Sequence, residues 1–287
     1  MKIAKVQNTA GKGVVGGTFP IVNYLALAIL AIAFTIPIVW SIKAAFLKSG
    51  DIFAKPIFDF SGPWTMQNFT VGLKTVPFFS FFLNSVIVAG VSTLVILITS
   101  LTAGYGFACF NFRWKKTLFA LVIASLLMPF ESIMIPLFIG EKQLHLIDSR
   151  LGIILPATVS AFGIFMMRQF LAAIPRELID AAYIDGCGFF AAFRKIVVPL
   201  AKAPMATLAA ISFLGNWNNY LWPLIVAQSQ NIYTLPIGLT MFRGNEGATN
   251  YGYIFAASFF AGIPALLIFL LMRRSIIQSY TLTGLNL

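Results

Sequence analysis

Six long apolar stretches constrain the fold of this chain more than any other feature. A helix needs about 20 apolar residues to cross the roughly 30 Å hydrocarbon layer of a bilayer. The predicted spans are Ile21–Ala45, Phe81–Ala108, Thr117–Ile139, Leu151–Phe170, Met205–Val226 and Tyr253–Met272. They lack the alternation of barrel strands, and only 10% of the residues are charged, against about a quarter in soluble domains. The sequence therefore predicts an all-α membrane protein with six transmembrane helices over residues 21–287, after an N-terminal segment of residues 1–20.

The positions of Lys and Arg predict how these spans are oriented, because cytoplasmic loops carry an excess of basic residues. With the N-terminus inside, most of the basic residues fall on the cytoplasmic side, in residues 1–20, 109–116, 171–204 and 273–287. We therefore expect both termini in the cytoplasm. The net charge of +11 then reflects topology rather than nucleic-acid binding, since the sequence holds no soluble domain with a basic patch.

Motifs that would indicate an enzyme are missing. The chain has no G-x-x-x-x-G-K-[ST] stretch, so it lacks a Walker A nucleotide site. The stretch "GKGVVG" at 11–16 fits G-x-G-x-x-G but follows no predicted strand, which favours a flexible lead-in to the first span. His145 is the only histidine, so we expect neither a zinc site nor a catalytic triad. Cys109 and Cys187 fall on the predicted cytoplasmic side, where thiols stay reduced. We therefore expect them to be small packed residues and not to form a disulfide.

One acid, Glu131, lies inside a predicted span, in "LLMPFESIMIPLF". A carboxylate there costs about 2.5–3.5 kcal/mol on insertion scales, so it usually faces protein or water. Glu131 therefore lines a substrate path, or it pairs with a basic residue of a neighbouring subunit near the outer interface. The flanking Pro129 and Pro136 favour a broken helix beside a cavity, where irregular backbone is tolerated in membranes.

The predicted cytoplasmic loop of about residues 171–204 concentrates acids in "ELIDAAYIDGCG", which begins at Glu177. Pro175 suits the first turn of a helix, and the helix dipole favours the acids Glu177 and Asp180 near its start. Gly186 fits just past the helix end, where a left-handed residue is needed. A second short helix follows, which Pro199 closes. The loop is therefore predicted to be a helix–turn–helix lying under the membrane.

The first helix of this loop has the features of a docking site for another protein. Its alanines let a second backbone approach closely, and its acids can pair with Arg or Lys of a partner. The alternative is an amphipathic helix resting on lipid, but such helices favour basic polar faces. The predicted docking residues are Glu177, Asp180, Ala181, Ala182, Asp185 and Gly186.

This loop resembles the EAA loop of permease subunits in binding-protein-dependent ABC importers, especially the carbohydrate group that includes maltose and glycerol-phosphate permeases. The pattern there is roughly I-P-x-E-L-x-E-A-A-x-I-D-G-A, with P-L-x-x-P further on. This chain has Asp180 in place of the usual Glu and Cys187 in place of the usual Ala. Other stretches resemble the family in the same order: "FLNSVIVAGVSTL", "AGYGFACFNF", "IPLF", "NWNNYLWPLIV" and "QSYTLTGL".

The resemblance implies a transport subunit that is not itself an enzyme, in the inner membrane of a bacterium. It implies a second, similar permease, two cytoplasmic ABC ATPases that carry ATP and Mg, and an extracytoplasmic solute-binding protein that delivers a sugar or sugar-like solute. The chain itself would hold no cofactor. The alternative is an ion-coupled secondary transporter, which predicts inverted repeats and intramembrane ionisable pairs. The sequence shows neither of these features.

Two further regions are candidate contacts of the transported solute or its binding protein. Trp217, Asn218, Asn219 and Tyr220 offer aromatic faces and amide hydrogen bonds to a sugar. They equally suit packing at a helix end and at the membrane interface, where Trp and Tyr anchor. In maltose-type relatives, a loop that matches Gly244, Asn245, Glu246 and Gly247 reaches into the binding protein and helps to release sugar. The alternative for this loop is a plain connector.

Overall fold

The computed structural model describes residues 21–243 and 249–283, and all regular elements in these two ranges are helical. The longer helices are α1 (Ile21–Ala45), α3 (Phe78–Cys109), α4 (Lys115–Leu126), α5 (Phe130–Gln143), α7 (Ala161–Ala172), α8 (Arg176–Ile184), α11 (Lys202–Trp217) and α14 (Tyr251–Thr283). The shorter ones are α2 (Gln67–Thr70), α6 (Arg150–Ile154), α9 (Phe189–Ala192), α10 (Val198–Leu200), α12 (Leu221–Val226) and α13 (Leu235–Thr240). Short 3₁₀ turns lie at Gly72–Lys74, Leu155–Thr158 and Gln230–Ile232, and a π-helical turn at Phe193–Val197 joins α9 to α10.

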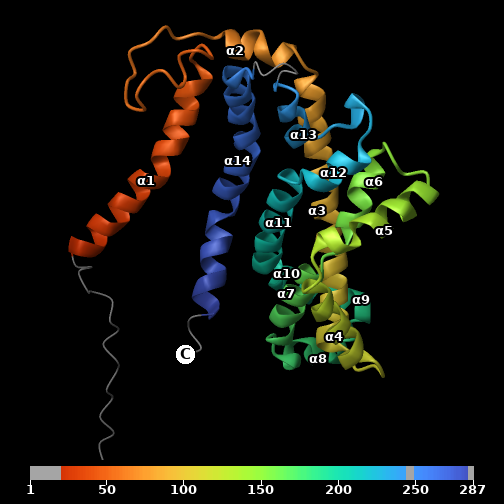
Figure 1. Cartoon of the computed structure of the whole chain (residues 1–287). Helices are drawn as coiled ribbons and strands as arrows, with labels where there is room; N and C mark the ends of the chain where they lie inside the picture. The colour runs from red at the N-terminus through yellow and green to blue at the C-terminus, as the bar shows by residue number, and fades with distance from the viewer. Residues whose placement is uncertain (1–20, 244–248, 284–287) are drawn as a thin grey trace, which may run out of the picture.

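Four helical stretches are long and apolar enough to cross a membrane alone: α1, α3, Arg150–Ala172 and Tyr251–Leu271. Two bent pairs bring the number to six. One pair is α4 with α5, bent by 103°, and the other is Phe189–Leu200 with α11, bent by 72°. Figure 1 shows the spans running alternately up and down between two sides of the molecule. The prediction of an all-α fold with six spans is confirmed.

Two of the predicted spans are interrupted. The third breaks between Leu126 and Phe130, as its prolines indicated, with Pro129 at the N-cap of α5. The fifth was expected to be continuous from Met205 to Val226, and this is wrong, because α11 ends at Trp217 and α12 begins at Leu221. Pro223 explains this second break, since proline has no N–H and its ring clashes with the carbonyl of the residue four positions earlier.

The central span is α3, which packs against α7, α11, α13 and the start of α6. Its contact with α7 depends on small residues. A Cβ atom on Gly104 would lie 2.7 Å from Cβ of Met167 and 2.9 Å from the backbone N of Arg168. A Cβ atom on Gly163 would collide with the Ser100 hydroxyl. Small residues spaced in this way let membrane helices approach closely.

The first span, α1, packs mainly along α14 and otherwise lies apart from the bundle (Figure 1). Of its residues only Lys43, Ala44 and Ala45, at its end, are buried. The Lys43 ammonium donates hydrogen bonds to the carbonyls of Pro56 (2.8 Å) and Ile57 (3.2 Å), which ties the following segment to the helix end. An apolar helix with so much exposed surface is typical of one that faces lipid or another membrane protein.

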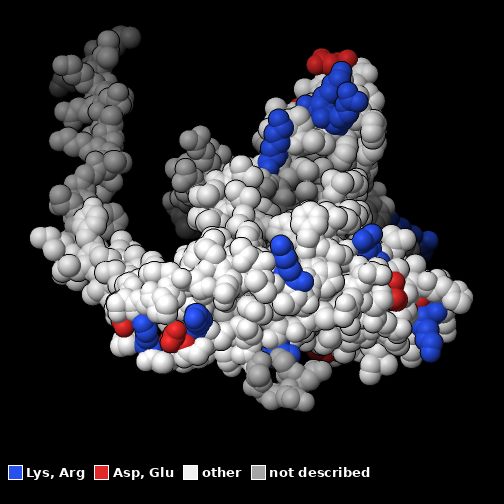
Figure 2. Space-filling view, turned by 90° about the horizontal axis from the view of Figure 1, so that it is seen from above, with Lys and Arg blue, Asp and Glu red and all other residues white. Residues whose placement is uncertain are grey.

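The connecting segments sort onto two sides of the molecule. Helices α8 and α9 lie on one side, where α1 begins and α14 ends, while α2 and α13 lie on the other (Figure 1). Figure 2 looks onto this second side and shows basic and acidic residues dispersed around a broad uncharged surface. The arrangement agrees with the predicted alternation of cytoplasmic and external loops.

Candidate functional site

The helix–turn–helix of the predicted cytoplasmic loop is present, and its turn is closed by Gly186. Helix α8 begins directly after Pro175, at Arg176, and ends at Ile184. Gly186 follows with φ +80°, the left-handed conformation expected for it. The N–H of Cys187 donates to the carbonyl of Ala182 (2.9 Å), and the N–H of Gly186 donates to that of Tyr183 (3.0 Å). These two bonds form a Schellman motif, which satisfies carbonyls at the helix end.

Helix α8 has one buried and one exposed face. Ile179 and Ala182 are buried against the body of the chain. The other predicted docking residues, Glu177, Asp180, Ala181, Asp185 and Gly186, are exposed. We predicted that Ala182 belongs to the docking face. It lies instead on the buried face, because it is about one helical turn beyond the buried Ile179. The exposed face also carries the apolar side chains of Leu178 and Ile184, the latter 86% exposed. An exposed face with acidic and apolar side chains is suited to contact with another protein.

An aromatic cluster, which sequence reasoning did not single out, joins this loop to the end of α3. The ring of Tyr105 stacks on Phe189 (centroids 5.5 Å apart) and contacts Phe193 (5.1 Å) and Phe110 (5.5 Å). The rings of Phe110 and Phe189 also meet, at 5.0 Å. The stretches "AGYGFACFNF" and "GFFAAF" are rich in aromatic residues, which could have pointed to this cluster. The sequence alone does not show that the two stretches meet.

The two interrupted spans meet at their breaks. The ring of Phe130, at the start of α5, contacts the indole of Trp222 in α12 edge to face, with centroids 5.8 Å apart. Glu131 follows Phe130 in the chain, and the turn with Asn218, Asn219 and Tyr220 precedes α12. The 12 residues of α4 rise about 18 Å, so its break lies well inside a roughly 30 Å layer. Irregular backbone at such depth is tolerated where it is buried in protein or lines a cavity.

The predicted substrate-path residues differ in how much surface they offer. Trp217 is buried, its indole N–H donates to the carbonyl of Ala261 (3.1 Å), and its ring stacks on Phe213. This agrees with the packing alternative for Trp217. Glu131, Asn218 and Tyr220 are exposed and Asn219 is half-buried, so these four residues remain accessible.

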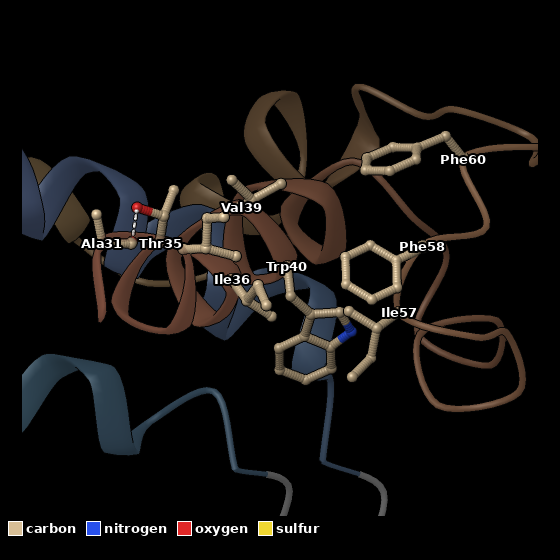
Figure 3. A pocket seen from close by; sticks show the side chains of 9 residues that line it. Ala31, Thr35, Ile36, Val39, Trp40, Ile57, Phe58 and Phe60 are labelled. Atoms are coloured by element: carbon tan, nitrogen blue, oxygen red, sulfur yellow. Dashed lines mark hydrogen bonds between the residues drawn. The ribbon is translucent and has the colours of Figure 1, made fainter. Parts of the chain in front are cut away.

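A pocket of about 270 Å³ lies between α1 and the segment that follows it (Figure 3). Its walls are almost entirely apolar: Ala31, Ile32, Ile36, Val39, Trp40, Ile57, Phe58 and Phe60. Thr35 is the one hydroxyl in its lining, and this hydroxyl donates to the carbonyl of Ala31 (2.6 Å). The pocket does not suit a sugar, whose hydroxyls need several hydrogen-bonding partners.

On the opposite side of the molecule from α8, Asp148 fixes the loop after α12. Its carboxylate accepts hydrogen bonds from the backbone N–H groups of Ser229 (2.8 Å) and Gln228 (2.9 Å). The hydrogen bond from the Ser229 backbone, followed by that from Gln228, lowers the pKa of the Asp148 carboxyl. The predicted binding-protein loop, Gly244, Asn245, Glu246 and Gly247, lies outside the described residues.

Comparison with known proteins identifies the family. Residues 96–278 match the family of binding-protein-dependent transport system inner membrane components. The chain is 38% identical to the arabinooligosaccharides transport system permease protein AraQ of Bacillus subtilis, over 73% of this chain and 74% of that protein. It is 33% identical to the lactose transport system permease protein LacG of Rhizobium radiobacter, over 90% of this chain and 93% of that one.

A solved structure of a bacterial ABC transporter that imports the acidic polysaccharide alginate has the same fold. One of its chains superposes with a TM-score of 0.80 at 20% identity, over 89% of this chain and 95% of that chain. The family match covers more than half of the sequence, and it agrees with the resemblance carried by the loop at Glu177–Gly188. The chain belongs to the family of inner membrane components of binding-protein-dependent transport systems.

Proposed function

We propose that this chain is one transmembrane subunit of an ATP-driven importer for a sugar or a sugar-like solute. The observation that carries the proposal is the exposed acidic and apolar face of α8, held in place by the Gly186 turn on the side of the molecule where α14 ends. The sequence has no Walker A motif, so in an ATP-driven importer the energy would come from a partner. One of two ABC ATPases, which carry ATP and Mg, would dock on this face, and the other would dock on the second permease.

The substrate class follows from the relatives. The permeases at 38% and 33% identity are named for arabinooligosaccharides and lactose, and another at 33% identity, from Yersinia pestis, is named for sn-glycerol-3-phosphate. These solutes share several hydroxyl groups. A polyhydroxylated solute of the size of a short oligosaccharide or a polyol derivative is therefore the proposed cargo.

The substrate path would run between this chain and a second, similar permease. Glu131, Asn218, Asn219 and Tyr220 present carboxylate, amide and phenol groups close to the meeting point of the two interrupted spans. The pocket in Figure 3 is apolar and lies elsewhere, at α1. A partner that covers the exposed break would enclose these polar groups away from lipid and complete a hydrophilic route.

Delivery would come from a solute-binding protein on the side opposite to α8. That side carries α2, α13 and the Asp148 loop, and the residues Gly244–Gly247 belong to the connection between α13 and α14 (Figure 1). By its place in the chain, this connection is suited to contact the binding protein.

Transport assays in proteoliposomes test the proposal directly. The chain would be reconstituted with its second permease, its ATPase and its binding protein, and loaded with radiolabelled oligosaccharide outside. Uptake should require ATP and the binding protein, and it should persist when ionophores collapse ion gradients. Uptake that needs an ion gradient and ignores ATP would instead establish the secondary-transporter alternative.

A further inference from the structure

The docking loop is joined to α3 by a set of aromatic and apolar contacts centred on the buried ring of Tyr105. Tyr105, Phe110, Phe189 and Phe193 form the aromatic cluster described above, here called the aromatic joint. Tyr105 is only 2% exposed. Ile179, from the buried face of α8, packs in the same core cluster as Tyr105, together with Met167 of α7 and Val197 of the π-helical turn. The inner end of α3 is thus enclosed by residues from both helices of the loop.

The other end of α3 is fixed just as closely to the opposite side of the molecule. Asn84 is buried, and its amide donates to the backbone carbonyls of Asn231 (2.8 Å) and Tyr233 (2.9 Å). The neighbouring Ser85 hydroxyl accepts a hydrogen bond from the backbone N–H of Leu235 (2.7 Å). These contacts attach α3 to the segment 231–235, which leads directly into α13.

Helix α3 runs unbroken for 32 residues with no proline inside it, and its part between Asn84 and Tyr105 is about 32 Å long. Sharp kinks in helices almost always occur at proline, at Gly/Ser pairs or at π-bulges. Helix α3 is a regular α-helix along its whole length. Two spans that start on the side of the docking loop are bent, the pair α4 and α5 by 103° and the pair Phe189–Leu200 and α11 by 72°. Helix α3 is therefore the stiffest connection from the docking loop to the opposite side.

We propose that the docking loop and α3 move as one body, fastened by the aromatic joint, and that this body carries ATPase-driven motion to segment 231–235. The inference rests on the proposed function, because it needs an ATPase on α8. It adds that Tyr105 and Phe189 are positioning residues for coupling, although neither lies on the exposed docking face. Coupling between two distant sites needs an element with two positions, and both sites must influence which position it takes.

Substitution of the joint tests this. In the reconstituted transporter, Tyr105→Leu and Phe189→Leu should keep the ATPase bound and hydrolysing ATP, while uptake falls about tenfold, within the usual range of coupling between sites. Tyr105→Phe should transport normally, because a phenylalanine ring keeps the contacts with Phe110, Phe189 and Phe193 that define the joint. Phe165→Leu is the matched control, since Phe165 stacks on Phe119 outside the joint.

A covalent replacement of the joint gives a second, independent test. In a chain with Cys109→Ala and Cys187→Ala, the double variant Tyr105→Cys/Phe189→Cys should transport poorly, and a short thiol-specific cross-linker should restore uptake. The proposal is overturned if cross-linking leaves uptake low, if the leucine variants transport normally, or if they release the ATPase. Failure of the proposed function is distinguishable, because the unsubstituted transporter would then take up sugar without ATP and only with an ion gradient.

Discussion

At Gly186 the backbone takes φ +80°, which a residue with a Cβ adopts only at a cost. A β-branched valine there should cost on the order of 1–2 kcal/mol and displace the second helix of the loop. We expect Gly186→Val to lower the yield of assembled transporter on size-exclusion chromatography. Gly188 provides the control, because its φ of −69° suits any residue and a Cβ at either glycine would meet no atom within 4 Å. Equal assembly of Gly186→Val and Gly188→Val would show that the turn does not depend on this conformation.

Glu177 is an exposed acid in the first turn of α8, close to the apolar docking surface. In Glu177→Lys the chain should still insert in the membrane, because the side chain makes no buried contact. A like charge facing a basic partner residue costs several kcal/mol at an interface, so ATPase association should weaken strongly and uptake should be lost. Co-purification of the ATPase and sugar uptake measure the two effects. Normal uptake by well-expressed Glu177→Lys would contradict the docking role.

Helices α3 and α7 form a contact that tolerates no added side chain at Gly104. An alanine Cβ there would approach Met167 Cβ to 2.7 Å, and the backbone of α7 would have to shift. Overpacking of this kind costs about 1–3 kcal/mol, so Gly104→Ala should lower the thermal unfolding temperature in detergent. In Gly106→Ala the added Cβ meets nothing within 4 Å, so this variant should unfold at or slightly above the wild-type temperature. Indistinguishable unfolding temperatures would argue against close packing at this point.

The connection between α13 and α14 is proposed to contact the solute-binding protein. Deletion of Asn245–Gly247 should leave assembly with the ATPase intact, because α13 and the start of α14 lie on the side of the molecule opposite to α8 (Figure 1). Stimulation of ATP hydrolysis by the loaded binding protein should fall, and so should uptake. If both survive the deletion, the segment is only a connector.

Much of the helix pattern was predictable because each span buries its own hydrogen bonds and depends little on its neighbours. The first span has the predicted bounds Ile21–Ala45, and Gly186 has the conformation that its place after α8 required. The break at Asn218–Tyr220 was missed, although Asn218 and Asn219 interrupt the apolar run there and Pro223 follows. The burial of Ala182 and the meeting of Tyr105 with Phe189 depend on tertiary packing, which no local pattern in the sequence encodes.

The whole molecule leaves large apolar surfaces open along α1, α4 and α5, and it exposes the break in its third span. A subunit with these surfaces requires lipid and a membrane partner around it. Its other exposed feature, the acidic face of α8, is suited to a partner on the side of the molecule where α14 ends. The proposed arrangement places an ABC ATPase on the exposed face of α8 and not on its buried face.

Site-directed cross-linking at two neighbouring alanines tests this claim most directly. In a chain with Cys109→Ala and Cys187→Ala, single cysteines would be placed by Ala181→Cys on the exposed face and by Ala182→Cys on the buried face of α8. After treatment of the assembled transporter with a short bifunctional thiol reagent, Ala181→Cys should yield an adduct with an ATPase carrying surface cysteines. Ala182→Cys should yield none. Absence of the adduct at Ala181→Cys, or equal adducts at both positions, would contradict the account.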